Sequence, residues 1–329
     1  MSQMSAPQED EKMRKVLVVF TVLMMCCGMM AFAEEWKPEK PIKLIVPWAP
    51  GGGTDTVARA LAKFGDKHFG VPIVVENVEG GMGALALQRV KASEPDGYEL
   101  VVASGYVGWI DKIRDFPVNF NDFTQVMCVN SDPAAFTVSA DASWNSIEEV
   151  VEYAKEHPGD LTVGHSGEGL VWHIAGASVA EYFDLEFNYV PFDGAAPANA
   201  AVMGGQIDAV SVSGAEVASQ VLGGKMKCLG ILGGSRLKPL PDVPTFKELG
   251  YDLEVYTHRG LVGAKGIPAE RVKVLYEGFS KIMDEPEFIE TMNNLGLGIY
   301  RLSPEEYASF IEQQATQALN ALKRIGLVE

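Results

Sequence analysis

Three glycine-rich segments of the chain could hold an anion through their backbone alone. They read PGGGTD at residues 50–55, GGMG at 80–83 and GHSGEG at 164–169. Glycine lets the backbone approach a ligand closely, and the first turn of a helix presents free N–H groups with a partial positive charge. If each segment joins a strand to a helix, their amides can converge on one carboxylate. Ordinary loops of an α/β sheet are the alternative interpretation.

The strength of such a site follows from its hydrogen bonds. A hydrogen bond to a charged group contributes roughly 1.5–3 kcal/mol, so about four to six of them contribute on the order of 6–18 kcal/mol before the cost of association. Micromolar binding needs about 8 kcal/mol. Backbone amides at a few loops are therefore sufficient in principle.

Enzymatic interpretations of the same segments fit less well. Residues 164–168 resemble the G-x-S-x-G turn of a nucleophilic serine, but the last of them is a glutamate where that turn needs a small residue, which argues against a hydrolase at Ser166. Residues 81–86 fit G-x-G-x-x-A, yet the next strand lacks the acidic residue that a dinucleotide site needs. The spacing of His165 and His173 is not typical of a metal site. We expect no enzymatic activity, no cofactor and no metal.

Strands and helices alternate along the chain after residue 33, as the spacing of apolar residues predicts. Ser146 and Glu149 predict a capping box at one helix start, and Ser303-Pro304 opens the last helix. The predicted strands are 43–48, 73–76, 99–103, 125–130, 135–139, 161–165, 187–192, 208–213 and 227–232. The predicted helices are 54–67, 84–92, 146–157, 170–182, 195–203, 215–222, 268–283, 286–294 and 303–325.

This alternation is typical of an α/β fold with helices on both faces of its sheets. The elements are too many for one sheet, so we expect two lobes, with chain crossovers near 126–138 and 228–260. We expect residues 34–132 to form the first part of lobe one, 133–235 to form lobe two, and 236–329 to return to lobe one and end in helices. The glycine-rich loops then lie at the carboxyl edges of strands, where ligands bind.

The first 33 residues predict a segment that is removed from the mature protein. Met13-Arg14-Lys15 is a basic start, 16–32 is an uncharged run of 17 residues, and Ala31-Phe32-Ala33 fits an A-x-A cleavage site. Together they indicate a secretory signal peptide and export to the periplasm. An uncleaved membrane anchor is the alternative, because the run has the minimum length for spanning a bilayer. Lipid attachment at Cys26 or Cys27 fits less well, because bulky residues precede them.

The net charge of −17 argues against nucleic acid or anionic lipid as a partner. It does not exclude an anionic ligand, because salt screens surface charges beyond about 8 Å. Two cysteines, Cys128 and Cys228, remain after cleavage. A disulfide and two buried free thiols are both compatible with their apolar surroundings.

Several segments, in the same order, resemble the Bug-type receptors of the tripartite tricarboxylate transporters. The resemblance runs from about residue 38 to the end of the chain. It is carried by KPIKLIVPWAPGGGTDTVARALA, VVENVEGGMGALALQRVKASEPDGYEL, WNSIEEVVEYAKEHPGDLTVGHSGEGLVWH, NYVPFDGAAPANAAVMGGQIDA and LPDVPTFKELGYDLEVYTHRGLVGAKGIP.

The resemblance implies a type II-like clamshell, with a mixed sheet flanked by helices in each lobe and the ligand in the cleft between them. It implies a small carboxylate ligand, such as citrate or another di- or tricarboxylate, and a partner permease of one large and one small subunit. We expect a monomer that closes on its ligand. A sensor that signals to a membrane kinase is the alternative with the same fold.

The resemblance also implies which residues contact the ligand. In lobe one they are Ala49, Pro50, Gly51, Gly52, Gly53, Thr54, Asp55, Gly81, Gly83, Ala84 and Ser104. In lobe two they are Ser166, Gly167, Gly169, His173, Asp193 and Gly194.

Four further positions carry expectations of their own: three depart from the common pattern of the family, and one lies near the return crossover. Leu170 stands where the family often has serine, and Met82 replaces a frequent glycine. Asp193 stands where many members have lysine, so it would repel an anion unless it caps the following helix. For Arg259, near the return crossover, a salt bridge across the hinge is favoured over direct contact with the ligand. These positions leave the identity of the carboxylate open.

Overall fold

The computed structural model describes residues 36–324 and 326–328. The chain divides into two units, 1–36 and 37–329, and the second contains the helices and strands of the described residues. The predicted signal peptide lies outside the described residues. Among the helices from residue 37 onward, none combines the length and the apolar character that a bilayer crossing needs.

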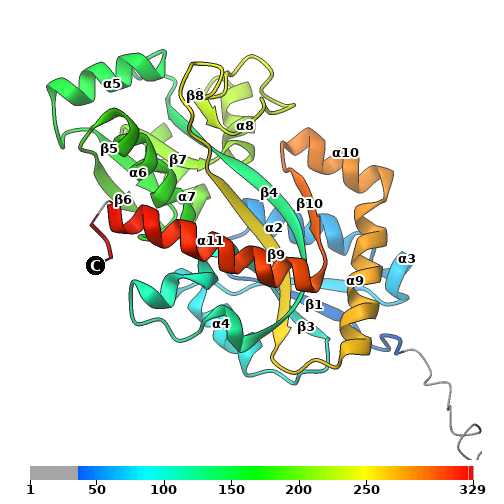
Figure 1. Cartoon of the computed structure of the whole chain (residues 1–329). Helices are drawn as coiled ribbons and strands as arrows, with labels where there is room; N and C mark the ends of the chain where they lie inside the picture. Colours follow the sequence, from blue (N-terminus) through cyan, green and yellow to red (C-terminus); the bar gives the residue numbers. More distant parts are fainter. Residues whose placement is uncertain (1–35, 325, 329) are drawn as a thin grey trace, which may run out of the picture. The chain divides into compact units, whose positions relative to one another are not determined.

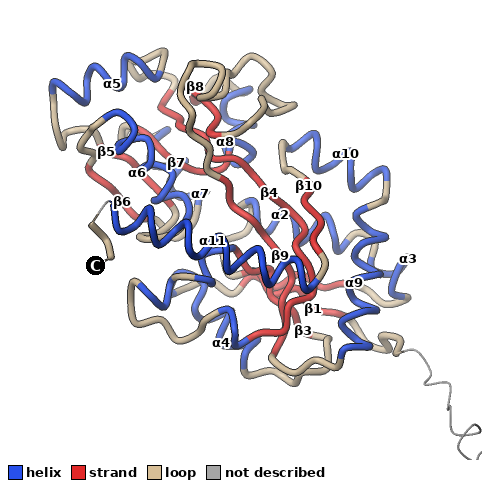
Figure 2. Tube along the Cα trace, viewed as in Figure 1, coloured by secondary structure: helices blue, strands red, loops and turns tan. Residues whose placement is uncertain are grey.

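Lobe one is built on a mixed sheet (Figures 1 and 2). β1 pairs in parallel with β2 and β3, whereas β9 is antiparallel to β3. In β1, Ile42, Leu44, Ile45 and Val46 are fully buried, which is typical of an aliphatic strand covered on both faces. The strands of this lobe are β1 (Ile42–Val46), β2 (Ile73–Asn77), β3 (Glu99–Ser104), β9 (Tyr256–Ala264) and β10 (Ile299–Leu302).

In lobe two, β5 lies between β6 and β7 and is parallel to both (Figure 2). β8 is antiparallel to β4 (Phe123–Ser139), which separates it from β7. At the start of α5 the Ser146 hydroxyl accepts the Glu149 N–H, but the Glu149 carboxylate accepts the Asn145 N–H, so the predicted capping box forms only in part. The strands are β5 (Thr162–His165), β6 (Asn188–Pro191), β7 (Ala209–Ser213) and β8 (Met226–Leu232). The helices are α5 (Ile147–Glu156), α6 (Val171–Phe183), α7 (Ala195–Met203) and α8 (Gly214–Leu222).

β4 (Phe123–Ser139) runs through both lobes as one strand of 17 residues. Its first part pairs with β9 and β10 and its second part with β7 and β8, which makes one sheet of 10 strands. The prediction of two strands at 125–130 and 135–139 was therefore wrong. The intervening Asn130, Asp132 and Pro133 resemble a turn, but the first two are fully buried and hydrogen-bonded within the sheet.

The helices of lobe one depart from prediction at one place. The predicted helix 54–67 is two helices, and the second begins at Gly65. Gly65 packs so closely on the backbone of Ile73 that a Cβ there would lie 2.6 Å from the Ile73 nitrogen. Strands β9 and β10 were not predicted. The helices are α2 (Gly53–Ala62), α3 (Gly65–Phe69), α4 (Ala84–Lys91), α9 (Ala269–Met283), α10 (Pro286–Leu295) and α11 (Pro304–Arg324).

The long helix α11 crosses in front of β4 and β9 (Figure 1) and packs on β4, on α6 and on the 3-10 turn η2 (Gly105–Gly108). Ile311 and Leu322 of α11 share a hydrophobic cluster with Leu170 and Ile174, so the core of lobe one continues onto the first turns of α6. A separate cluster fills lobe two. Cys128 and Cys228 are both free thiols.

Candidate functional site

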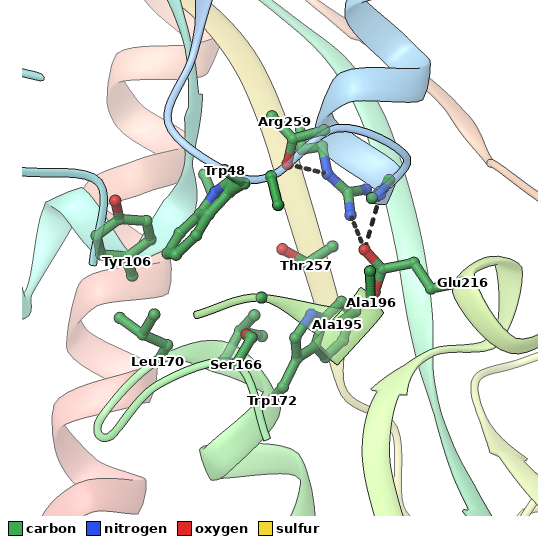
Figure 3. A pocket seen from close by; sticks show the side chains of 17 residues that line it. Trp48, Tyr106, Ser166, Leu170, Trp172, Ala195, Ala196, Glu216, Thr257 and Arg259 are labelled. Carbon is green, nitrogen blue, oxygen red and sulfur yellow. Dashed lines mark hydrogen bonds and ion pairs between the residues drawn. The ribbon is translucent and has the colours of Figure 1, made fainter. Parts of the chain in front are cut away.

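A small pocket lies between the lobes (Figure 3). Lobe one contributes the loop after β1 and the end of β3, lobe two contributes the loop after β5 and the starts of α6, α7 and α8, and β9 adds two residues. The cavity has a volume of about 40 Å³, enough for a few water molecules. Its lining consists of Trp48, Ala49, Gly52, Gly53, Thr54, Ser104, Tyr106, Ser166, Leu170, Val171, Trp172, Gly194, Ala195, Ala196, Glu216, Thr257 and Arg259.

Arg259 is the centre of a buried polar cluster at one end of this pocket. Its Nε donates to the Thr54 hydroxyl at 3.0 Å, and its Nη1 donates to Asn130 Oδ1 at 2.6 Å and to the Asp132 carboxylate. Its Nη2 lies 3.6 Å from Glu216 Oε1. The guanidinium is only 2% exposed, so its charge must be compensated by these carboxylates. Arg259 thus forms ion pairs with Asp132 of β4 and with Glu216 of α8, and the same side chain also lines the pocket.

Glu216 reaches across the cleft from lobe two to lobe one. Glu216 is part of the capping box at the start of α8, where its Oε2 accepts the Ser213 N–H at 3.2 Å. Its Oε1 accepts the Gly53 N–H, in the first turn of α2, at 2.8 Å (Figure 3). Burial raises the pKa of Glu216, although Arg259 and the Gly53 amide oppose that rise.

The start of α2 fits against Arg259 and Glu216 because residue 53 is a glycine. A Cβ on Gly53 would lie 2.4 Å from Arg259 Nη2. Asp55 holds the loop from inside, because its carboxylate accepts hydrogen bonds from the Gly51 N–H, from Arg59 and from Asn77. Burial alone would raise the pKa of Asp55, but these hydrogen bonds outweigh it and lower the pKa.

The loop between β5 and α6 is held by two histidines of its own lobe. The Gly167 N–H donates to Nδ1 of His165 at 3.2 Å, and the Gly169 N–H donates to Nδ1 of His173 at 3.1 Å. The two rings stack with their centroids 4.3 Å apart. Burial lowers the pKa of His165 to about 3 and that of His173 to about 4, so both rings are neutral acceptors.

The same loop also contacts lobe one. The Trp109 indole donates to the Gly169 carbonyl at 3.0 Å in a buried position, and Arg114 forms an ion pair with Glu168 at 2.8 Å. These contacts, with the Glu216 bond to Gly53, connect the two lobes beside the pocket.

The second glycine-rich turn supports the pocket without lining it. Gly83 begins α4 with φ of 85° and packs against Tyr106, whose hydroxyl would lie 2.5 Å from a Cβ at that position. The Tyr106 hydroxyl donates to the Met82 carbonyl at 2.8 Å. The turn therefore positions the Tyr106 ring, which does line the pocket.

A second cavity, of about 320 Å³, borders the first. Gly51 and Asn199 line it, as do Leu222 and Leu295, which are exposed. The two cavities share Gly52, Gly53, Ala195, Ala196 and Glu216, which therefore lie between them.

The structure brings together part of the predicted site. The predicted residues that line the pocket are Ala49, Gly52, Gly53, Thr54, Ser104, Ser166 and Gly194. Those outside its lining are Pro50, Gly51, Asp55, Gly81, Gly83, Ala84, Gly167, Gly169, His173 and Asp193.

The expected helix cap at Asp193 was wrong. Helix α7 has Gly194 as its N-cap and no side-chain cap, and within residues 36–324 the Asp193 carboxylate has no hydrogen-bond partner. The side chains of His173 and Asp55 lie outside the pocket lining for another reason. Each uses its polar atoms to shape a loop whose other residues face the pocket.

Several lining residues were missed by reasoning from the sequence. Trp48 and Tyr106 lie one and two residues from the predicted Ala49 and Ser104, so extending those segments would have found them. Glu216 stands in a visible S-x-x-E pattern, but its partner Gly53 is 163 residues away in the chain. No local signal predicts that contact.

No group of three or more His, Cys, Asp and Glu side chains in the described part of the chain is arranged to hold a metal ion. The hydroxyls of Ser104 and Ser166 have no hydrogen-bond partner among the described residues, although each residue is only 8% exposed. The Thr257 hydroxyl, which also lines the pocket, likewise has no partner among these residues. The pocket thus combines one compensated ionic end with three unpaired hydroxyls and aromatic and aliphatic walls.

Two α/β lobes that share a sheet and enclose a pocket define a solute-binding protein of the clamshell type. The model of the tripartite tricarboxylate transporter family receptor matches residues 57–327. The chain belongs to this family of receptors, and it is a binding protein rather than an enzyme.

Known proteins resemble the chain over almost its whole length. A protein encoded in the gbd 5′ region of Cupriavidus necator is 30% identical over 295 residues, which is 89% of each chain. The structure of the periplasmic binding protein BugD is 28% identical with a TM-score of 0.81, covering 88% of this chain and 99% of that one. The structure of MatC from Rhodopseudomonas palustris with bound malate is 27% identical with a TM-score of 0.79, covering 87% and 99%.

Proposed function

We propose that this receptor captures a small carboxylate in the cleft outside the cytoplasmic membrane and delivers it to a tripartite permease of one large and one small membrane subunit. The observation that carries the proposal is the pocket between the lobes, with unpaired hydroxyls and a helix start on its walls. The bound malate of MatC supports a carboxylate as the ligand class. The secretory pattern at residues 13–33 supports the location.

The ligand carboxylate has donors available on both lobes. Ser104 and Ser166 offer hydroxyls that are otherwise unpaired. The first turn of α7, at Ala195 and Ala196, offers backbone N–H groups that no side chain caps. Hydrogen bonds of this kind to a carboxylate are each worth roughly 1.5–3 kcal/mol, so a few of them give useful affinity.

Ligand binding and closure are coupled in this proposal. Ligand first contacts lobe one, and the loop at 166–170 then completes the site from lobe two, so the ligand stabilises the closed arrangement through contacts that exist only there. We propose that residues 34–132 and 236–329 move together as one lobe relative to residues 133–235. The axis of this movement would lie at β4 and β9, where the chain passes between the lobes. A closed receptor is the form that the permease recognises.

A thermal denaturation screen tests the carboxylate class. The mature protein is mixed with mono-, di- and tricarboxylates, and with amines and sugars of similar size as controls. A ligand at about 100 times its dissociation constant adds about 2.7 kcal/mol to the free energy of unfolding, which raises Tm measurably. The proposal predicts a shift with at least one carboxylate and none with the controls. The proposal is contradicted if only the controls raise Tm, or if no compound raises it.

A further inference from the structure

We propose that Glu216 determines the specificity of this pocket, because it places a carboxylate of the protein where a second carboxylate of a ligand would bind. The receptor then prefers a ligand with one carboxylate and a compact apolar body over di- and tricarboxylates. This inference rests on the proposed function and narrows its ligand class.

The charged groups that could bind a second ligand carboxylate already bind one another. Arg259 is the only cationic side chain among the described residues that line the pocket. Glu216 Oε1 lies 3.6 Å from its Nη2 and accepts the Gly53 N–H of α2 at 2.8 Å. The remaining Arg259 nitrogens donate to Thr54, Asn130 and Asp132. A ligand carboxylate at this end would have to displace Glu216.

The charges of the cluster disfavour that displacement. One guanidinium faces two carboxylates, those of Asp132 and Glu216, and all three residues are buried or nearly so. A further carboxylate beside them would meet a site that has no uncompensated positive charge. Buried like charges repel strongly because little water screens them.

The rest of the pocket suits an apolar body. Trp48 and Tyr106 come from lobe one, and Leu170 and Trp172 face them from lobe two (Figure 3). Leu170 is 2% exposed and Trp172 is 4% exposed. The polar groups away from Glu216 are the hydroxyls of Ser104, Ser166 and Thr257, the indole N–H groups of Trp48 and Trp172, and the first turn of α7. All of these groups are neutral, so none of them supplies a positive charge to balance a second carboxylate.

The test compares acids that share a body and differ by one carboxylate: butanoate with succinate, and hexanoate with adipate, with citrate added. Isothermal titration calorimetry gives dissociation constants for the wild type and for Glu216→Gln and Glu216→Ser. Glutamine keeps the shape and removes the charge, while serine also makes room beside Arg259. Glu156→Gln, at an exposed position of α5, is the matched control.

We expect the wild type and Glu156→Gln to bind at least one monocarboxylate about ten times more tightly than its dicarboxylate partner. Both Glu216 variants should reduce this ratio about tenfold, chiefly by gaining dicarboxylate affinity, since Arg259 Nη2 and the Gly53 N–H become available. The ratio is measured within each protein, so a general loss of stability does not change it.

Two failures can be told apart. If the wild type binds succinate, adipate or citrate as tightly as the monocarboxylates, or if the Glu216 variants leave the ratio unchanged, the specificity role is wrong while the carboxylate function stands. If none of the proteins binds any acid of the panel, the carboxylate function fails and the role of Glu216 falls with it.

Discussion

Two neutral imidazoles shape the loop between β5 and α6. His165 and His173 accept backbone N–H groups through Nδ1, and a protonated ring has no lone pair with which to accept. Their rings also stack at 4.3 Å, so two positive charges there would repel. The fold therefore depends on both rings staying unprotonated.

Lowering the pH should destabilise the protein through these rings. An unfolded histidine titrates near about 6.5, whereas burial lowers the pKa of His165 to about 3 and of His173 to about 4. At a pH between the pKa of the folded state and that of the unfolded state, the unfolded state binds more protons. The free energy of unfolding therefore falls as the pH falls. From pH 7.5 to pH 5 we expect a loss of up to about 4 kcal/mol from the two rings, measured by urea denaturation.

The variant His165→Asn/His173→Asn keeps an acceptor oxygen at both positions and does not titrate. It should lose most of this pH dependence, while His157→Gln, at an exposed position, should retain it. A double variant with the wild-type slope would show that other groups cause the loss.

Individual residues of the site were predictable only where the local pattern defines their role. Gly53 and Thr54 were found because a glycine-rich segment precedes a helix, and both line the pocket. His173 and Gly169 were expected to face the ligand but bond to each other, because a sequence does not say which way a loop N–H points. Glu216 and Asp132 meet Arg259 through tertiary contacts that no spacing encodes.

At the scale of elements, the start of α2 is where backbone geometry limits substitution. Gly53→Ala would bring a Cβ to 2.4 Å from Arg259 Nη2 and 3.0 Å from Glu216 Oε1. We expect a loss of about 1–2 kcal/mol in urea denaturation, because overpacking costs about 1–3 kcal/mol and the helix propensity of alanine recovers up to about 1 kcal/mol.

The neighbouring glycine provides the control. A Cβ on Gly52 would meet nothing closer than 3.7 Å, and its φ of −76° suits any residue. Gly52→Ala should therefore stay within about 0.5 kcal/mol of the wild type. Equal effects of the two substitutions would contradict the close packing at Gly53.

Most helices and the strands of the parallel pairs were predictable from the spacing of their apolar residues and from the glycine and proline residues beside their ends. α7 and α10, for example, begin at the predicted residues. β9 was missed because its buried positions include Thr257, His258 and Arg259, which resemble a surface segment until their partners are known. β4 was divided for the same reason, since its central Asn130 and Asp132 face the Arg259 cluster.

At the scale of the whole receptor, closure depends on a few contacts outside the pocket. The Trp109 indole donates to the Gly169 carbonyl across the lobes. Trp109→Phe keeps an aromatic ring but removes the N–H donor, so the buried Gly169 carbonyl is unpaired in the closed form. An unpaired buried carbonyl costs about 1–3 kcal/mol. We expect about 5- to 150-fold weaker carboxylate binding by calorimetry and a larger radius of gyration in small-angle scattering without ligand.

Trp144→Phe changes an indole that packs on Tyr153 within lobe two, so it should leave both measurements unchanged. Unaltered affinity in Trp109→Phe would mean that the contact does not contribute to closure.

Helix α11 limits how such a clamshell can move. Its Ile311 packs on Gly105 and Gly108 of lobe one, and a few residues beyond its end Leu327 lies beside His165 and His173 of lobe two. A helix of 21 residues does not stretch. If the lobes separate, they must turn about this helix or move Leu327 away from the two histidines. We therefore expect the C-terminal segment to limit how far the entrance for a solute can widen.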